Sequence, residues 1–141
     1  MTAGQRLRVV LNLLNISTAF GVLIALVTRT HLEHGPRGLL LGTGYRPKLP
    51  AAGAFTVGNV VIYRGDRAFI DDRPRLLAHE ERHSTQYAAC LGLPFLPLYA
   101  VAALWSLWKT GNPGSRNPFE RSAGLEAGGY VELPVLKRFV K

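Results

Sequence analysis

The feature that most constrains this fold is a long apolar segment near the amino terminus, LRVVLNLLNISTAFGVLIALV, which covers residues 7–27. Its last 19 residues, 9–27, contain no charged side chain. As one helix they would extend about 28 Å, close to the hydrocarbon thickness of a bilayer. A secretory signal peptide would need a small-x-small cleavage site after the apolar core, and VTRTHLEHG offers none. The sequence therefore predicts an uncleaved transmembrane anchor over residues 1–30 and a second domain over residues 31–141.

Charge supports the membrane interpretation without setting an orientation. The chain is 48% hydrophobic and carries a net charge of +8, a combination typical of membrane proteins whose basic residues lie beside lipid headgroups. Arg6 and Arg8 precede the uncharged residues 9–27, and Arg29 and Arg37 follow them, so the positive-inside rule favours neither side. The basic residues are scattered and accompany no recognition motif, so nucleic acid is not an expected partner. The predicted location is the cell membrane, crossed once, with membrane lipids as partners.

A second apolar segment, LGLPFLPLYAVAALWSLW, covers residues 91–108. Pro94 and Pro97 interrupt a helix near its start, which leaves residues 98–108 unbroken. As a helix these would extend about 16 Å, too short to cross a bilayer. The segment is therefore expected to be a re-entrant, an interfacial or a buried core helix.

The residues between the two apolar segments predict an α+β domain. β-branched and aromatic residues at 55–63, followed by a turn at RGD, are typical of a β-hairpin whose second strand would end at Ile70. Two aspartates and then Pro74 favour the start of a helix that would continue to about residue 90. A second, short helix is expected around residues 119–125.

The predicted long helix carries the motif HEERH. His79 and His83 are four residues apart, so both side chains share one helix face and can offer nitrogen atoms to one metal ion. Glu80 is rotated by about 100° from His79, beside the open side of such an ion. A catalytic zinc keeps one position for water and lowers the pKa of that water, and a glutamate can pass its proton to a leaving amine. These residues predict a zinc site with Glu80 as general base in amide hydrolysis.

A third ligand is expected in the carboxyl-terminal part of the chain. Glu120 in RNPFERSAG lies on the predicted short helix, and a carboxylate with two histidines is a recognised catalytic zinc set. His31 and His34 in HLEH are the histidine alternatives. Gln86 and Tyr87 share the face of the motif histidines and are candidates for groups that hold the ligands in place; the alternative is that both residues only pack the helix against its neighbours.

The motif pair HEERHSTQYA and NPFERSAG resembles the zincin metallopeptidases whose third zinc ligand is a glutamate, and in particular small bacterial membrane proteins with HExxH. The resemblance covers about residues 55–129. It implies a minimal gluzincin-like domain in which His79, His83 and Glu120 bind Zn²⁺ and Glu80 is the general base.

The same resemblance implies a place for the substrate. A strand at about residues 57–63 would line the cleft and pair with an extended peptide. Arg82 departs from the family pattern, because the residue before the second histidine is usually uncharged and packs against the core.

The membrane and metal predictions constrain each other. If residues 91–108 crossed the bilayer, His79 and Glu120 would lie on opposite sides and could not share an ion. The sequence therefore predicts one transmembrane helix followed by a zincin-like domain. This domain contains, in order, a short hairpin or sheet, the HExxH helix, an apolar membrane-associated segment and the helix of the third ligand.

The predicted function is that of a membrane-anchored zinc metallopeptidase with a peptide substrate. The alternative is a non-catalytic small subunit of a larger membrane complex that keeps a structural zinc site. In that alternative, polar side chains of the anchor would make hydrogen bonds to helices of the complex. These side chains are Asn12, Asn15, Ser17 and Thr18.

Overall fold

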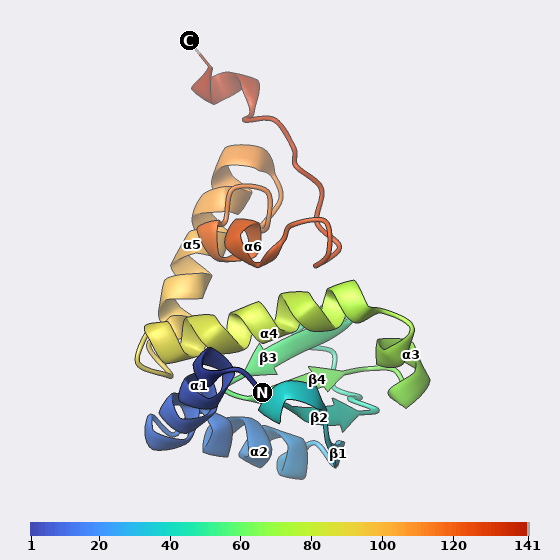
Figure 1. Cartoon of the computed structure of the whole chain (residues 1–141). Coiled ribbons are helices and arrows are strands. Elements are labelled where there is room, and N and C mark those ends of the chain that lie inside the picture. Colours follow the sequence, from blue (N-terminus) through green and yellow to red (C-terminus); the bar gives the residue numbers. More distant parts are fainter. Residues whose placement is uncertain (141) are drawn as a thin grey trace. The chain divides into compact units, whose positions relative to one another are not determined.

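A mixed four-stranded sheet forms the centre of the amino-terminal part of the chain (Figure 1). The computed structural model describes residues 1–140, and the chain divides into one unit at Met1–Leu93 and another at Pro94–Lys141. The sheet belongs to the first unit, with the strand order β1-β2-β4-β3. Antiparallel pairs join β1 to β2 and β3 to β4, while β2 and β4 are parallel. The strands are β1 His31–His34, β2 Leu40–Thr43, β3 Ala54–Val57 and β4 Val60–Tyr63.

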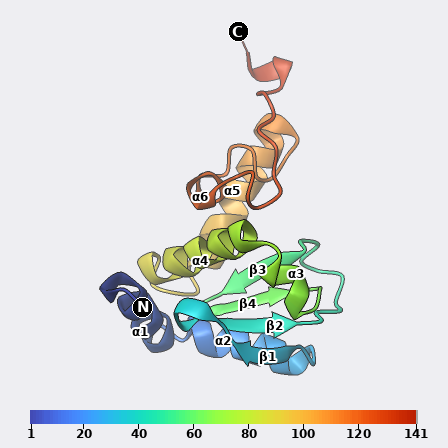
Figure 2. The ribbon, with the colours of Figure 1, turned by 45° about the vertical axis from the view of Figure 1, so that its right-hand side comes forward.

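Helices cover both faces of this sheet, with α2 on one face and α4 on the other (Figures 1 and 2). Successive residues of a strand point to opposite faces, so Val61 of β4 packs in one cluster with Leu77 of α4, and Val60 packs in another with Ala25 of α2. The first unit therefore has two small cores separated by the sheet, and the predicted α+β class is confirmed. Its helices are α1 Ala3–Leu14, α2 Ser17–Val27, η1 Pro36–Gly38, α3 Arg67–Asp71 and α4 Pro74–Ala89.

The β-hairpin lies earlier in the chain than the sequence predicts. Its turn is at Gly58 and Asn59, inside the run expected to be one strand. Gly58 has a φ of +63°, and a Cβ there would lie 2.4 Å from the backbone nitrogen of Thr18, so this turn requires glycine. The residues expected as the second strand form α3 instead, because Asp66 accepts a hydrogen bond from the Phe69 backbone N–H and caps that helix.

The apolar segment near the amino terminus is not one helix. α1 and α2 meet at a bend of 70°, where Ile16 has a left-handed φ of 62°. The Asn15 side chain accepts hydrogen bonds from the Ser17 backbone and hydroxyl, which compete with helical bonding at this point. The prediction of a continuous helix over residues 9–27 is therefore wrong.

Because of this bend, no straight helix covers the predicted membrane anchor. Among the helices of residues 1–140, none alone has the length and apolar character needed to cross a bilayer, whereas α1 and α2 together meet both criteria. The transmembrane anchor over residues 1–30 stays a prediction.

The second unit is mainly helical. α5 begins at Phe95 rather than at residue 98, because Pro97 lies in its first turn, where backbone N–H groups have no partner within the helix. Asn117 caps α6 by accepting a hydrogen bond from the Phe119 backbone N–H at 3.0 Å. Phe119 also packs edge-on against Phe95, with ring centroids 5.0 Å apart, which holds α6 against α5. The helices of this unit are α5 Phe95–Thr110, α6 Pro118–Ala123 and η2 Lys137–Phe139.

Replacing Gly21 by alanine should destabilise the first unit. A Cβ at Gly21 would lie 2.5 Å from the Val57 carbonyl oxygen and 2.9 Å from the Val60 Cβ, so α2 would have to move off the sheet. We expect the free energy of unfolding to fall by about 1–3 kcal/mol, the usual cost of overpacking. Chemical denaturation measures the change. Gly4→Ala is the control, because a Cβ there meets only the Thr2 hydroxyl at 3.9 Å; an equal loss in both variants would contradict close packing at Gly21.

Candidate metal centre

The two motif histidines point their Nε2 atoms at each other from successive turns of α4. The nitrogens of His79 and His83 are 2.9 Å apart, the rings lie edge to face, and both residues are buried. Two tetrahedral ligands with zinc–nitrogen bonds of about 2.0–2.1 Å hold their nitrogens about 3.3 Å apart. A shift of a few tenths of an ångström would therefore let both rings bind one ion, and the donor set fits zinc.

The outer nitrogen of His83 is held by a neighbour on the same helix. His83 Nδ1 lies 2.8 Å from the amide oxygen of Gln86. Because that oxygen only accepts hydrogen bonds, Nδ1 carries the hydrogen and the lone pair lies on Nε2, the atom that faces His79. The structure shows this contact between Gln86 and the histidine pair, and the role of Gln86 in holding a metal ligand stays a prediction.

Glu80 is fixed by the edge strand of the sheet. The Thr56 hydroxyl of β3 donates to Oε2 of Glu80 at 2.7 Å and also lies 3.1 Å from the Glu80 carbonyl oxygen. Both residues are buried. Burial raises the pKa of Tyr87 above its ordinary value, and the negative charge of Glu80 raises it further, so the phenol stays neutral beside this carboxylate. Thr56 could not be assigned from the sequence, because nothing local links a threonine in a strand to a glutamate 24 residues later.

Glu120 lies on α6 and is buried. Within the second unit, the Tyr99 hydroxyl of α5 donates to Oε1 of Glu120. Burial is the main cause of a raised pKa at Tyr99, and the Glu120 carboxylate adds to it, so Tyr99 acts as a neutral hydrogen-bond donor. No local pattern indicates Tyr99, because its hydroxyl meets Glu120 only through the packing of α5 on α6.

The three predicted ligands His79, His83 and Glu120 are a buried group that could hold a metal ion, and its donor atoms do not identify the metal. The histidine alternatives His31 and His34 are exposed on β1, and no such group of residues 1–140 includes them. The assignment of each residue to a catalytic or ligand role stays a prediction.

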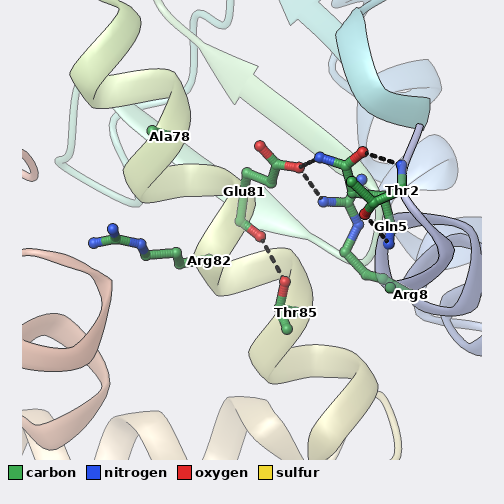
Figure 3. A pocket seen from close by; sticks show the side chains of 8 residues that line it. Thr2, Gln5, Arg8, Ala78, Glu81, Arg82 and Thr85 are labelled. Carbon is green, nitrogen blue, oxygen red and sulfur yellow. Dashed lines mark hydrogen bonds and ion pairs between the residues drawn. The ribbon is translucent and has the colours of Figure 1, made fainter.

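The second glutamate of the motif faces the other way. Glu81 binds Nη1 of Arg8 at 2.6 Å and Nε of Arg37 at 2.5 Å. Consecutive helix residues are rotated by about 100°, so Glu80 and Glu81 serve different neighbours. Figure 3 shows Glu81 turned toward α1, beside an open pocket of about 410 Å³ between α1 and α4. The pocket is lined by Thr2, Gly4, Gln5, Arg8, Ala78, Glu81, Arg82 and Thr85.

Arg82 does not disturb the packing of the site helix. Its side chain is exposed and points away from Glu81 and Arg8 (Figure 3). The charge that departs from the zincin pattern therefore lies on the surface, and the core-facing residues of α4 include Leu77, Ser84 and Ala88.

Polar residues expected to serve a larger complex are used inside the chain. The Asn12 amide donates to Oδ1 of Asn59 at 3.0 Å and to the Ser84 carbonyl at 2.9 Å. Thr18 accepts from the Asn59 backbone N–H at 3.1 Å, and Asn15 pairs with Ser17. These side chains were predicted to bond to helices of a larger membrane complex. The bonds that the structure shows for them lie within the chain, so this interpretation of them is wrong. They tie α1, α2 and the β3–β4 turn to the site helix.

A comparison of the chain with models of known protein families, with characterised proteins and with solved structures finds no match. The likeness to zincins consequently rests on the two motifs alone.

Proposed function

We propose that this protein is a zinc-dependent, metallopeptidase-like hydrolase that works at a membrane surface. His79, His83 and Glu120 are its zinc ligands and Glu80 is its general base. One observation carries the proposal: two imidazole nitrogens 2.9 Å apart lie on the same helix as a buried glutamate whose orientation a strand hydroxyl fixes. A purely structural zinc site has no use for that glutamate, whereas hydrolysis requires it.

The roles of the surrounding side chains follow from their contacts. The two imidazoles and the carboxylate would hold the zinc ion, which would supply a lowered pKa of a bound water molecule and polarisation of a carbonyl group. Glu80 takes the proton of the attacking water and delivers it to the leaving amine. Thr56 keeps the carboxylate in one orientation, and Gln86 keeps the His83 Nε2 lone pair available.

The substrate proposed for this site is an extended peptide. β4 pairs with strands on both sides, whereas β3 pairs only with β4 among residues 1–140. The strand expected at 57–63 was assigned this role from the sequence, but of β3 and β4 only β3 has an outer edge that can accept a further strand. Because β3 also carries Thr56, main-chain pairing along this edge would align a peptide beside Glu80.

Metal content tests the ligand set. The purified protein, dialysed against buffer with trace zinc, should contain one zinc per chain by elemental analysis. His79→Ala and Glu120→Ala should each lose most of it, because two remaining ligands bind zinc weakly. Glu80→Gln is the matched control and should keep the metal, since Glu80 is adjacent to the ligands and does not coordinate.

Two results would contradict parts of the proposal separately. Full zinc content in Glu120→Ala would reject Glu120 as the third ligand, but it would leave the assignment of His79 and His83 intact. A parent protein that binds no zinc would remove the hydrolase proposal altogether. Circular dichroism of each variant checks that the loss of metal does not reflect unfolding.

A further inference from the structure

The first helix of the chain has its polar side inside and its apolar side outside. The inward face of α1 carries Gln5, Arg8, Asn12 and Asn15, and Arg8 and Asn12 are 4% and 0% exposed. On the opposite face four large apolar side chains are exposed: Leu7, Val10, Leu11 and Leu14. A surface helix in water has the reverse arrangement. The outward face of α1 is therefore built for apolar surroundings.

The second helix continues this apolar surface. α2 packs on the sheet through small or polar residues such as Gly21 and Ala25, and its outer side again carries large apolar side chains. These are Phe20, Leu23, Leu26 and Val27, of which Val27 is 74% exposed. A helix that is apolar on all sides needs a covered environment on each of them. The sheet covers only one side of α2.

Charge identifies what covers the outer side. Residues 1–32 contain no aspartate or glutamate, and the exposed Arg6 and Arg29 lie toward the two ends of the α1–α2 pair. Apolar side chains with arginines at the margin complement an anionic bilayer, where the hydrocarbon takes the apolar face and the headgroups take the cations.

We propose that the outward face of α1 and α2 lies in the plane of an anionic lipid bilayer and does not cross it. Crossing would draw Arg8 away from Glu81 and Asn12 away from Asn59 and Ser84, and it would place these polar groups in hydrocarbon. The in-plane position keeps every one of these bonds. This inference deepens the proposed membrane location but uses no part of the metal site, so it stands or falls on its own test.

Vesicle binding tests the surface. The protein should co-sediment with vesicles of phosphatidylcholine and phosphatidylglycerol, more weakly with vesicles of phosphatidylcholine alone, and less at high salt. The double variant Leu23→Glu, Leu26→Glu should lose affinity for both vesicles by at least about tenfold, because two apolar side chains no longer insert. Leu49→Glu is the control, since Leu49 is exposed in the first unit but outside α1 and α2. If the parent protein binds neither kind of vesicle, the proposal is overturned in favour of a protein partner. The proposal is also overturned if the double variant binds vesicles as tightly as the parent does.

Cysteine labelling separates lying on the membrane from crossing it, and it does not depend on the acidic variants folding. Gly4→Cys and Arg29→Cys, each in a Cys90→Ser background, mark the two ends of α1 and α2. In sealed membrane vesicles from expressing cells, a membrane-impermeant maleimide should reach both positions from the same side. Labelling of the two positions from opposite sides would restore the single-pass anchor and reject the in-plane position.

Discussion

Hydrolysis of peptides should fall by about 10²–10⁴-fold when Glu80 is replaced by glutamine, while zinc content and stability stay those of the parent. Glutamine keeps the size of the side chain and an oxygen that can accept from the Thr56 hydroxyl, but it cannot take a proton from water. Turnover of an internally quenched peptide library, compared between the zinc-loaded parent and variant, measures the effect.

Thr56→Val is the matched variant for this prediction. It removes the hydroxyl that orients Glu80 but leaves the carboxylate, so its loss of turnover should be smaller than that of Glu80→Gln. Equal turnover in the parent and Glu80→Gln would reject the general-base role and would favour a zinc site that serves structure only.

The adjacent glutamate should show the opposite behaviour. Replacing Glu81 by glutamine should lower the free energy of unfolding by about 3 kcal/mol, because the buried Arg8 guanidinium loses its counter-charge. Zinc content should be unchanged, since Glu81 faces α1. Urea denaturation of the metal-free proteins measures the difference without a contribution from zinc binding.

Glu33→Gln provides the control for charge removal. Glu33 pairs with Arg67 at 3.2 Å in the same unit, and both side chains are more than a third exposed. The loss there should stay below about 1 kcal/mol. If Glu81→Gln cost no more than Glu33→Gln, the Arg8–Glu81 pair would be no more than a surface contact.

The site helix was predictable because its signals are local. Proline at the start of α4 and histidines four residues apart need only helical geometry to be interpreted. α6 was predictable for the same reason, with Asn117 as its cap. Thr56 and Tyr99 were not, because each meets its glutamate through packing between separate elements.

The amino-terminal segment shows where hydropathy alone misleads. A count of apolar residues gives the same result whether polar side chains turn toward lipid, toward another helix or toward the interior of the fold. Ile16 itself gives no sign of the break, because a β-branched residue rarely adopts a positive φ, and the competing bonds from Ser17 to Asn15 are recognised only in the structure. Arg8 was interpreted as a charge flanking a membrane span, and it is instead a buried partner of Glu81.

The network of Asn12, Asn59 and Ser84 also sets a rotational register. In water, the exposed leucines of α1 would favour a rotation of the helix about its own axis that buries its outer side. Such a rotation would turn the Asn12 amide and the Arg8 guanidinium outward and leave their partners, the Ser84 carbonyl and the Glu81 carboxylate, facing leucine side chains. Each unsatisfied buried polar group costs about 1–3 kcal/mol, and more when it is charged, which offsets the gain from burying leucine. These buried hydrogen bonds therefore fix the rotation of α1 and keep its leucines on the outer side, whether or not anything covers them.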